Sequence, residues 1–147
     1  MHSDPILKTL EEQVGCYQRL AKLAELQHQH VQQGQTEGLL DVLGRRQEVL
    51  DQVARLEGNL STVKAQWPAY LAGLTPESRA HAERLLGETR RLLEQITTAD
   101  RNDSLVLQQR KMNLGRQINQ AQSAKSINRT YAAAAYGTRR PGMDIKQ

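Results

Sequence analysis

Histidine and cysteine are the first side chains to consider in this sequence as metal ligands or, for cysteine, as a nucleophile. The cysteine is Cys16, and the four histidines are His2, His28, His30 and His81. On a helix His28 and His30 would point in different directions, so they could not readily share a metal. Cys16 has Arg19 as its nearby basic residue, and we interpret it as a small packing residue.

The motifs that usually carry enzyme chemistry are missing from the sequence. It has no glycine-rich phosphate loop, no metal-ligand spacing and no nucleophile motif. A single cysteine also rules out an internal disulfide. We therefore expect no enzyme activity, no cofactor and no metal.

Charge is distributed unevenly along the chain. Residues 1–100 contain 11 Lys/Arg and 14 Asp/Glu, whereas residues 101–147 contain 9 and 2. A basic last third suits an acidic protein, nucleic acid or a membrane surface, or serves only to keep a tail soluble. We expect no nucleic-acid binding, because Tyr131 and Tyr136 are not interleaved with the arginines as a base-stacking surface requires.

Residues 1–15 contain charged side chains and no continuous apolar segment, so no secretory signal is expected. No stretch approaches the 18 or so apolar residues of a transmembrane helix. These features and the single cysteine predict a cytoplasmic protein that does not insert into a membrane.

The strongest periodic pattern lies between residues 39 and 67. Apolar residues recur at alternating spacings of three and four, with Arg46 as the one polar exception; they are Leu39, Val42, Val49, Val53, Leu56, Leu60, Val63 and Trp67. A second row is expected to widen this stripe: Leu40, Leu43, Gln47, Leu50 and Ala54. A period of about 3.5 residues is typical of a helix that packs lengthwise on other helices.

A helix over residues 5–33 would supply the first partner. Asp4 is its expected N-cap, and Gly34 is placed to end it in a left-handed conformation. Its apolar seam has the same alternating spacing: Leu7, Leu10, Val14, Tyr17, Ala21, Ala24, His28 and Val31. With Thr36 as the next N-cap, the very short loop predicts an antiparallel hairpin with a second helix over 36–67.

A third helix is expected over residues 76–130, with Thr75 as its N-cap. Its seam is Ala82, Leu85, Thr89, Leu92, Ile96 and Ala99. The polar run 97–104 weakens the helix, and periodicity resumes at Leu107. The fold class is therefore all-α: an antiparallel hairpin and a long third helix form a three-helix coiled-coil bundle. We expect residues 1–136 to form a single helical domain, and residues 137–147 a flexible tail.

The sparse third helix offers candidates for binding another amphipathic helix. They are Leu105, Leu107, Met112, Leu114 and Ile118. In one interpretation the weakly held segment 100–130 opens and a partner helix takes its place. In the other, these residues complete the intramolecular bundle.

Several segments together resemble the FlgN family of flagellar export chaperones. In the first half of the chain the similar segments are residues 24–35 and 39–43, Arg46-Gln47-Glu48-Val49-Leu50 and Leu56-Glu57. In the second half they are Asn102-Asp103-Ser104-Leu105-Val106-Leu107 and the pair Tyr136-Gly137. The run Tyr131-Ala-Ala-Ala-Ala-Tyr136 departs from the family in being more helix-prone than a loose tail.

The resemblance implies a cytoplasmic chaperone that binds the C-terminal helices of the hook–filament junction proteins FlgK and FlgL. Such chaperones prevent premature assembly and deliver their clients to the export gate protein FlhA. The implied client contacts are Asn102, Leu105, Leu107 and the helix beyond, and the implied gate contacts are Tyr136 and Tyr131. A structural coiled-coil scaffold that forms a homodimer, without chaperone activity, is the alternative.

Overall fold

The computed structural model describes the backbone of residues 4–137 and the side chains of residues 4–134. This part of the chain forms four α-helices and no strand: α1 Pro5–Gln33, α2 Thr36–Lys64, α3 Trp67–Ala72 and α4 Pro76–Gly137. The all-α prediction is confirmed. Apart from Gly137, the expected flexible tail lies outside the described residues. The chain divides into two compact units, Met1–Val106 and Leu107–Gln147, which are described separately.

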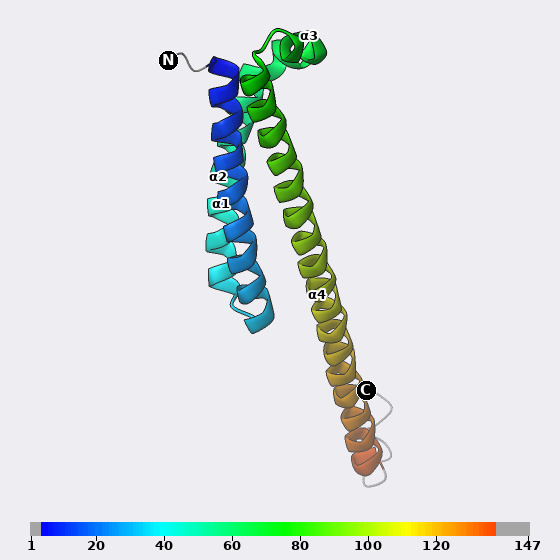
Figure 1. Cartoon of the computed structure of the whole chain (residues 1–147). Coiled ribbons are helices and arrows are strands. Elements are labelled where there is room, and N and C mark those ends of the chain that lie inside the picture. Colours follow the sequence, from blue (N-terminus) through cyan, green and yellow to red (C-terminus); the bar gives the residue numbers. More distant parts are fainter. Residues whose placement is uncertain (1–3, 138–147) are drawn as a thin grey trace. The chain divides into compact units, whose positions relative to one another are not determined.

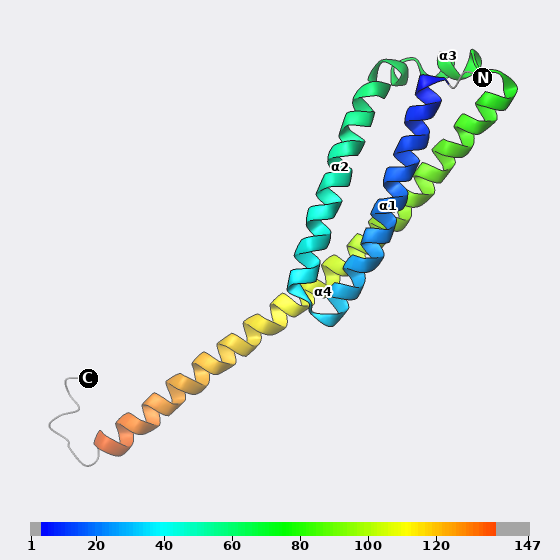
Figure 2. The ribbon, with the colours of Figure 1, turned by 90° about the vertical axis from the view of Figure 1, so that its left-hand side faces the viewer.

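In the first unit, α1 and α2 form the expected antiparallel hairpin (Figure 1, Figure 2). The Asp4 carboxylate accepts a hydrogen bond of 2.8 Å from the Ile6 N–H, so Asp4 is the N-cap of α1. Gly34 ends α1 with φ 67° and ψ 29°, a left-handed conformation that glycine adopts without steric cost. The N-cap of α2 is Gln35, not Thr36 as predicted, because Thr36 is already the first residue with helical geometry.

The first 31 residues of α4, 76–106, complete a three-helix core with this hairpin. The first buried cluster joins all three helices and contains Val14, Cys16, Tyr17, Leu20, Ala21, Val53, Leu56, Leu92 and Ile96. The second lies closer to the start of α1 and contains Leu7, Leu10, Leu60 and Ala82. The seams predicted for the three helices thus supply the core. Cys16 is fully buried, as its interpretation as a packing residue requires.

The second helix ends earlier than predicted, at Lys64 rather than at residue 67. Pro68 has no N–H to donate to the Lys64 carbonyl, and its ring disfavours helical geometry at the preceding residue. Pro68 instead lies in the first turn of α3, where its missing N–H costs nothing. Leu71 and Leu74 pack against the second cluster.

Two predictions about helix faces are wrong. The second row on α2 is exposed rather than buried, with Leu40, Leu43 and Leu50 at 63%, 45% and 41% exposure. On α4 the seam does not stop at Ala99 but continues with the same alternating spacing to Asp103 and Val106, which are buried and half-buried. On α2 the seam is therefore narrow, and these three flanking leucines remain in solvent.

The fourth helix is longer than predicted and extends from Pro76 to Gly137. The Thr75 hydroxyl accepts a hydrogen bond of 3.1 Å from the Ser78 N–H, which confirms Thr75 as its cap. The polar run 97–104 is helical throughout, because Asp100 and Asp103 bond to other helices rather than to their own backbone. Among the described residues, none of the helices is long and apolar enough to span a membrane.

Candidate binding site

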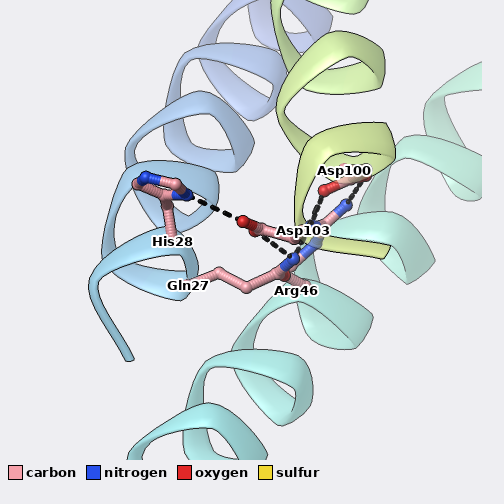
Figure 3. A network of polar contacts seen from close by, with 5 residues as sticks. All are labelled: Gln27, His28, Arg46, Asp100 and Asp103. Atoms are coloured by element: carbon pink, nitrogen blue, oxygen red, sulfur yellow. Dashed lines mark hydrogen bonds and ion pairs between the residues drawn. The ribbon is translucent and has the colours of Figure 1, made fainter. Parts of the chain in front are cut away.

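Three polar residues occupy seam positions at the hairpin-loop end of the first unit. They are His28 on α1, Arg46 on α2 and Asp103 on α4. Gln27 and Asp100 complete a polar cluster that joins all three helices (Figure 3). The cluster replaces the aliphatic contacts found further along the bundle.

Arg46 is the centre of this polar cluster. Its Nη1 donates to Asp100 Oδ1 and to Gln27 Oε1, both at 2.6 Å, and its Nη2 donates to Asp100 Oδ2 at 2.7 Å. The forked geometry matches a planar guanidinium to a planar carboxylate. The hydrogen bond with Asp100 raises the pKa of Arg46 above its ordinary value, against the opposing effect of burial. The contacts within the bundle therefore favour the charged form of Arg46, although the side chain lies in the seam.

Asp103 is the most deeply buried member, with a side chain 2% exposed. Its Oδ2 accepts a 3.1 Å hydrogen bond from Gln27 Nε2, and its Oδ1 lies 2.8 Å from His28 Nδ1. A buried carboxylate is costly unless polar partners surround it. Those partners come from α1, so together with the aliphatic clusters they favour one alignment of the first part of α4 along the hairpin.

A shallow groove of about 410 Å³ lies beside this cluster, between α1 and the first part of α4. Its lining residues are Ala21, Ala24, Glu25, His28, Gln29, Gln95, Ala99 and Asn102. Asn102 is thus an exposed residue that lines this groove together with three alanines and four larger polar side chains. Leu105, in the same unit, is 60% exposed and takes no part in either core cluster.

The second unit carries the other predicted client contacts on a helix whose side chains are mostly in solvent. Leu107, Met112, Leu114 and Ile118 are 41%, 55%, 57% and 50% exposed. At about 100° per residue, Leu107, Leu114 and Ile118 share one face. Met112 lies on the opposite face. The helix thus brings three of the four together and separates the fourth.

The two tyrosines predicted to contact the export gate both lie on α4 rather than in a loose tail. Tyr131 is 72% exposed. Tyr136 has a helical backbone, but its side chain lies outside the described residues. Tyr131 is therefore accessible to a partner.

The polar cluster was missed in the sequence, although a signal for it was present. Arg46 and His28 are the polar interruptions of two otherwise apolar seams, and Asp103 continues the third seam by four residues from Ala99. Polar residues at matching depths of three seams indicate a shared polar layer. No group of three or more His, Cys, Asp or Glu in the described residues could hold a metal ion.

Comparison with protein families matches residues 1–137 to the FlgN protein family. Searches of curated proteins and of solved structures gave no significant match. The match covers all four helices and extends from the first unit into the second. This chain belongs to the FlgN family of flagellar export chaperones.

Proposed function

We propose that this chaperone acts in the cytoplasm, where it binds the C-terminal helices of the hook–filament junction proteins FlgK and FlgL. Binding would cover their apolar faces, prevent premature assembly and allow delivery to FlhA. The observation that carries the proposal is the row of exposed aliphatic side chains on the second unit of a chain in this family. Exposed aliphatic residues at helical spacing are what an amphipathic helix packs against.

The proposed client surface on the second unit is the stripe of Leu107, Leu114 and Ile118, which are exposed and share one face of the helix. The other predicted client contacts are also exposed, but Met112 lies on the opposite face of this unit, and Asn102 and Leu105 belong to the first unit. Because their side chains are already in solvent, docking on them needs no displacement of the helix that carries them. Asp100 and Asp103, by contrast, are bonded to the hairpin. This favours direct docking over the interpretation in which residues 100–130 open.

Calorimetric titration with peptides from the C-terminal ends of FlgK and FlgL tests the proposal. We expect stoichiometric binding that is lost in Leu107→Asp/Leu114→Asp. The matched control is Leu43→Asp/Leu50→Asp on α2, whose leucines are also about half exposed and have the same seven-residue spacing. No binding by the intact chain, or equal loss in both variants, would contradict the proposed surface.

The gate contact is proposed for Tyr131 and Tyr136. The accessibility of Tyr131 supports this role. Pull-down of FlhA by the client-loaded chaperone should weaken in Tyr131→Ala/Tyr136→Ala, while client affinity stays unchanged. A loss of client affinity in that variant would instead assign these tyrosines to the client surface.

The alternative, a structural coiled-coil homodimer, is supported by one observation. Leu40, Leu43 and Leu50 form an exposed apolar row with coiled-coil spacing on α2. Solution mass from light scattering distinguishes the two functions. A dimer that Leu43→Asp/Leu50→Asp dissociates, in a chain that binds neither client peptide, would favour the scaffold.

A further inference from the structure

The helix of the second unit carries a one-sided pattern of positive charge. Its described residues 107–134 contain no Asp or Glu, and five basic residues: Arg110, Lys111, Arg116, Lys125 and Arg129. Lys111, Arg116, Lys125 and Arg129 are exposed. A helix kept soluble by charge alone would be expected to place that charge away from its apolar residues.

The basic residues instead gather around the apolar stripe formed by Leu107, Leu114 and Ile118. At about 100° per residue, Lys125 falls on the line of the stripe, and Lys111, Arg129 and Arg110 fall within about 60° of it. The opposite face carries Arg116 as its one charged residue within 107–134. The other residues of this face include the uncharged Gln109, Met112, Asn119, Gln120, Ser123, Ile127 and Thr130.

We infer that the partner of this stripe is an amphipathic helix with acidic residues beside its apolar face. This inference rests on the proposed function, because it names the class of client that the same surface accepts. Leucine and isoleucine would supply the apolar contact. Lysine and arginine at the edges would pair with Asp or Glu of the partner, raising the association rate and selecting against basic helices.

Two other acidic or anionic surfaces suit this helix less well. Membrane-surface helices usually carry Trp, Phe or many leucines along the apolar face, whereas the stripe contains three large aliphatic residues. Single-stranded nucleic acid requires stacking aromatics, and Tyr131 is the one aromatic side chain described in this unit. A protein helix needs neither feature.

A pair of designed helical peptides tests the inference without knowledge of the client. Both share one leucine face; in one the flanking positions are Glu, and in the other they are Lys. We expect the full-length chain to bind the Glu-flanked peptide, and to bind the Lys-flanked peptide at least roughly tenfold more weakly. The affinity for the Glu-flanked peptide should fall as NaCl is raised, since exposed charges are screened.

Charge reversal within the helix supplies the matched control. Lys111→Glu and Arg116→Glu make the same change in exposed residues of the same helix, but on opposite faces. Lys111→Glu should weaken binding of the Glu-flanked peptide by roughly fivefold or more. Arg116→Glu should change it less than about twofold. Circular dichroism of both variants would confirm that the helix content is unchanged.

Several outcomes would overturn the inference. They are equal binding of the two peptides, no binding of either, and equal effects of Lys111→Glu and Arg116→Glu. Binding to phosphatidylglycerol vesicles or duplex DNA without selection between the peptides would assign the charge to a membrane or nucleic acid instead.

Titration of FlgK and FlgL peptides in the same variants separates this inference from the proposed function. Suppose that the chain binds those peptides, that Leu107→Asp/Leu114→Asp abolishes the binding, and that Lys111→Glu and Arg116→Glu change the affinity equally. The proposed function is then supported and the acidic-helix inference is contradicted. If the FlgK and FlgL peptides do not bind but the Glu-flanked peptide does, the acidic partner survives and the named clients fail.

Discussion

Two hydrogen bonds, of 2.6 and 2.7 Å, join the guanidinium of Arg46 on α2 to the carboxylate of Asp100 on α4. The Arg46 side chain is 14% exposed and that of Asp100 is 37% exposed. The pair therefore lies at the edge of the seam, where desolvation is incomplete and the attraction is not fully screened. It ties α4 to the hairpin at a point that the aliphatic clusters do not reach.

Replacing Arg46 should destabilise the bundle. Arg46→Met keeps much of the aliphatic packing but leaves Asp100 and the buried Asp103 without their cation. We expect a loss of about 2–3 kcal/mol in the free energy of unfolding, below the ~3–5 kcal/mol of a fully buried pair because Asp100 is partly in solvent. Urea unfolding followed by circular dichroism measures it.

The matched control for Arg46→Met is Arg45→Met. Arg45 pairs with Asp41 at 3.2 Å, but both side chains are about 60% exposed. Such a pair contributes less than about 1 kcal/mol, so the control should shift stability by about 0.5 kcal/mol or less. An equal loss of unfolding free energy in the two variants would mean that the polar cluster contributes no more stability than an exposed ion pair.

Two glycine substitutions should change stability in opposite directions. Gly34→Ala places a Cβ on a residue with φ 67° and should cost about 1 kcal/mol or more. Gly44 lies within α2, and a Cβ there would meet no atom within 4 Å. Gly44→Ala should therefore stabilise the chain by about 0.5–1 kcal/mol. Thermal unfolding of the two variants gives the signs, and a stabilising Gly34→Ala would contradict the assigned hairpin loop.

The stability of the first unit should fall at alkaline pH through Tyr70 on α3. Burial, reinforced by the nearby Asp4 carboxylate, raises the pKa of Tyr70 to about 12. Between pH 10 and 12 the unfolded chain would lose this proton and the folded chain would keep it. The folded state then binds more protons, so stability decreases as pH rises through this window.

Comparison of the parent chain with Tyr70→Phe isolates this effect, since burial also raises the pKa of Tyr17. The variant should lose less stability between pH 10 and 12 than the parent does. Tyr131→Phe is the control, because Tyr131 is 72% exposed, and its profile should follow that of the parent. Identical profiles for all three would show that Tyr70 ionises freely in the folded state.

Cys16 should report on the opening of the core. It is fully buried in the first cluster, so a thiol reagent should modify the native chain far more slowly than the chain in concentrated urea. The rate in native buffer should follow global unfolding, and it should increase in Arg46→Met by the factor that the loss of stability predicts. Rapid native modification would place Cys16 outside the core.

The periodic pattern of the sequence was sufficient to predict most of the fold. Three seams with alternating three- and four-residue spacing indicated three packed helices, and Asp4, Gly34 and Thr75 marked their ends. These features are local: capping and left-handed glycine geometry depend on a few neighbouring residues. Element type and most boundaries followed from them.

The sequence could not show which flanking residues the bundle would bury. Leu40, Leu43 and Leu50 were expected to widen the α2 seam but are exposed, because burial depends on the distance and rotation of the neighbouring helices. The same limit hid the pairing of Arg46 with Asp100, which are 54 residues apart. Periodicity identifies a face, not the residue across from it.

The candidate client residues could be predicted only in part. Their helical spacing and apolar character were evident in the sequence. The order of the motifs indicated a resemblance to the FlgN family, which the family match confirmed. Exposure of Leu107, Leu114 and Ile118 was decided by tertiary structure, since the same residues could have completed a bundle. The sequence determined where the helices form and which residues share a face; packing between helices decided which faces are buried and which remain available to a partner.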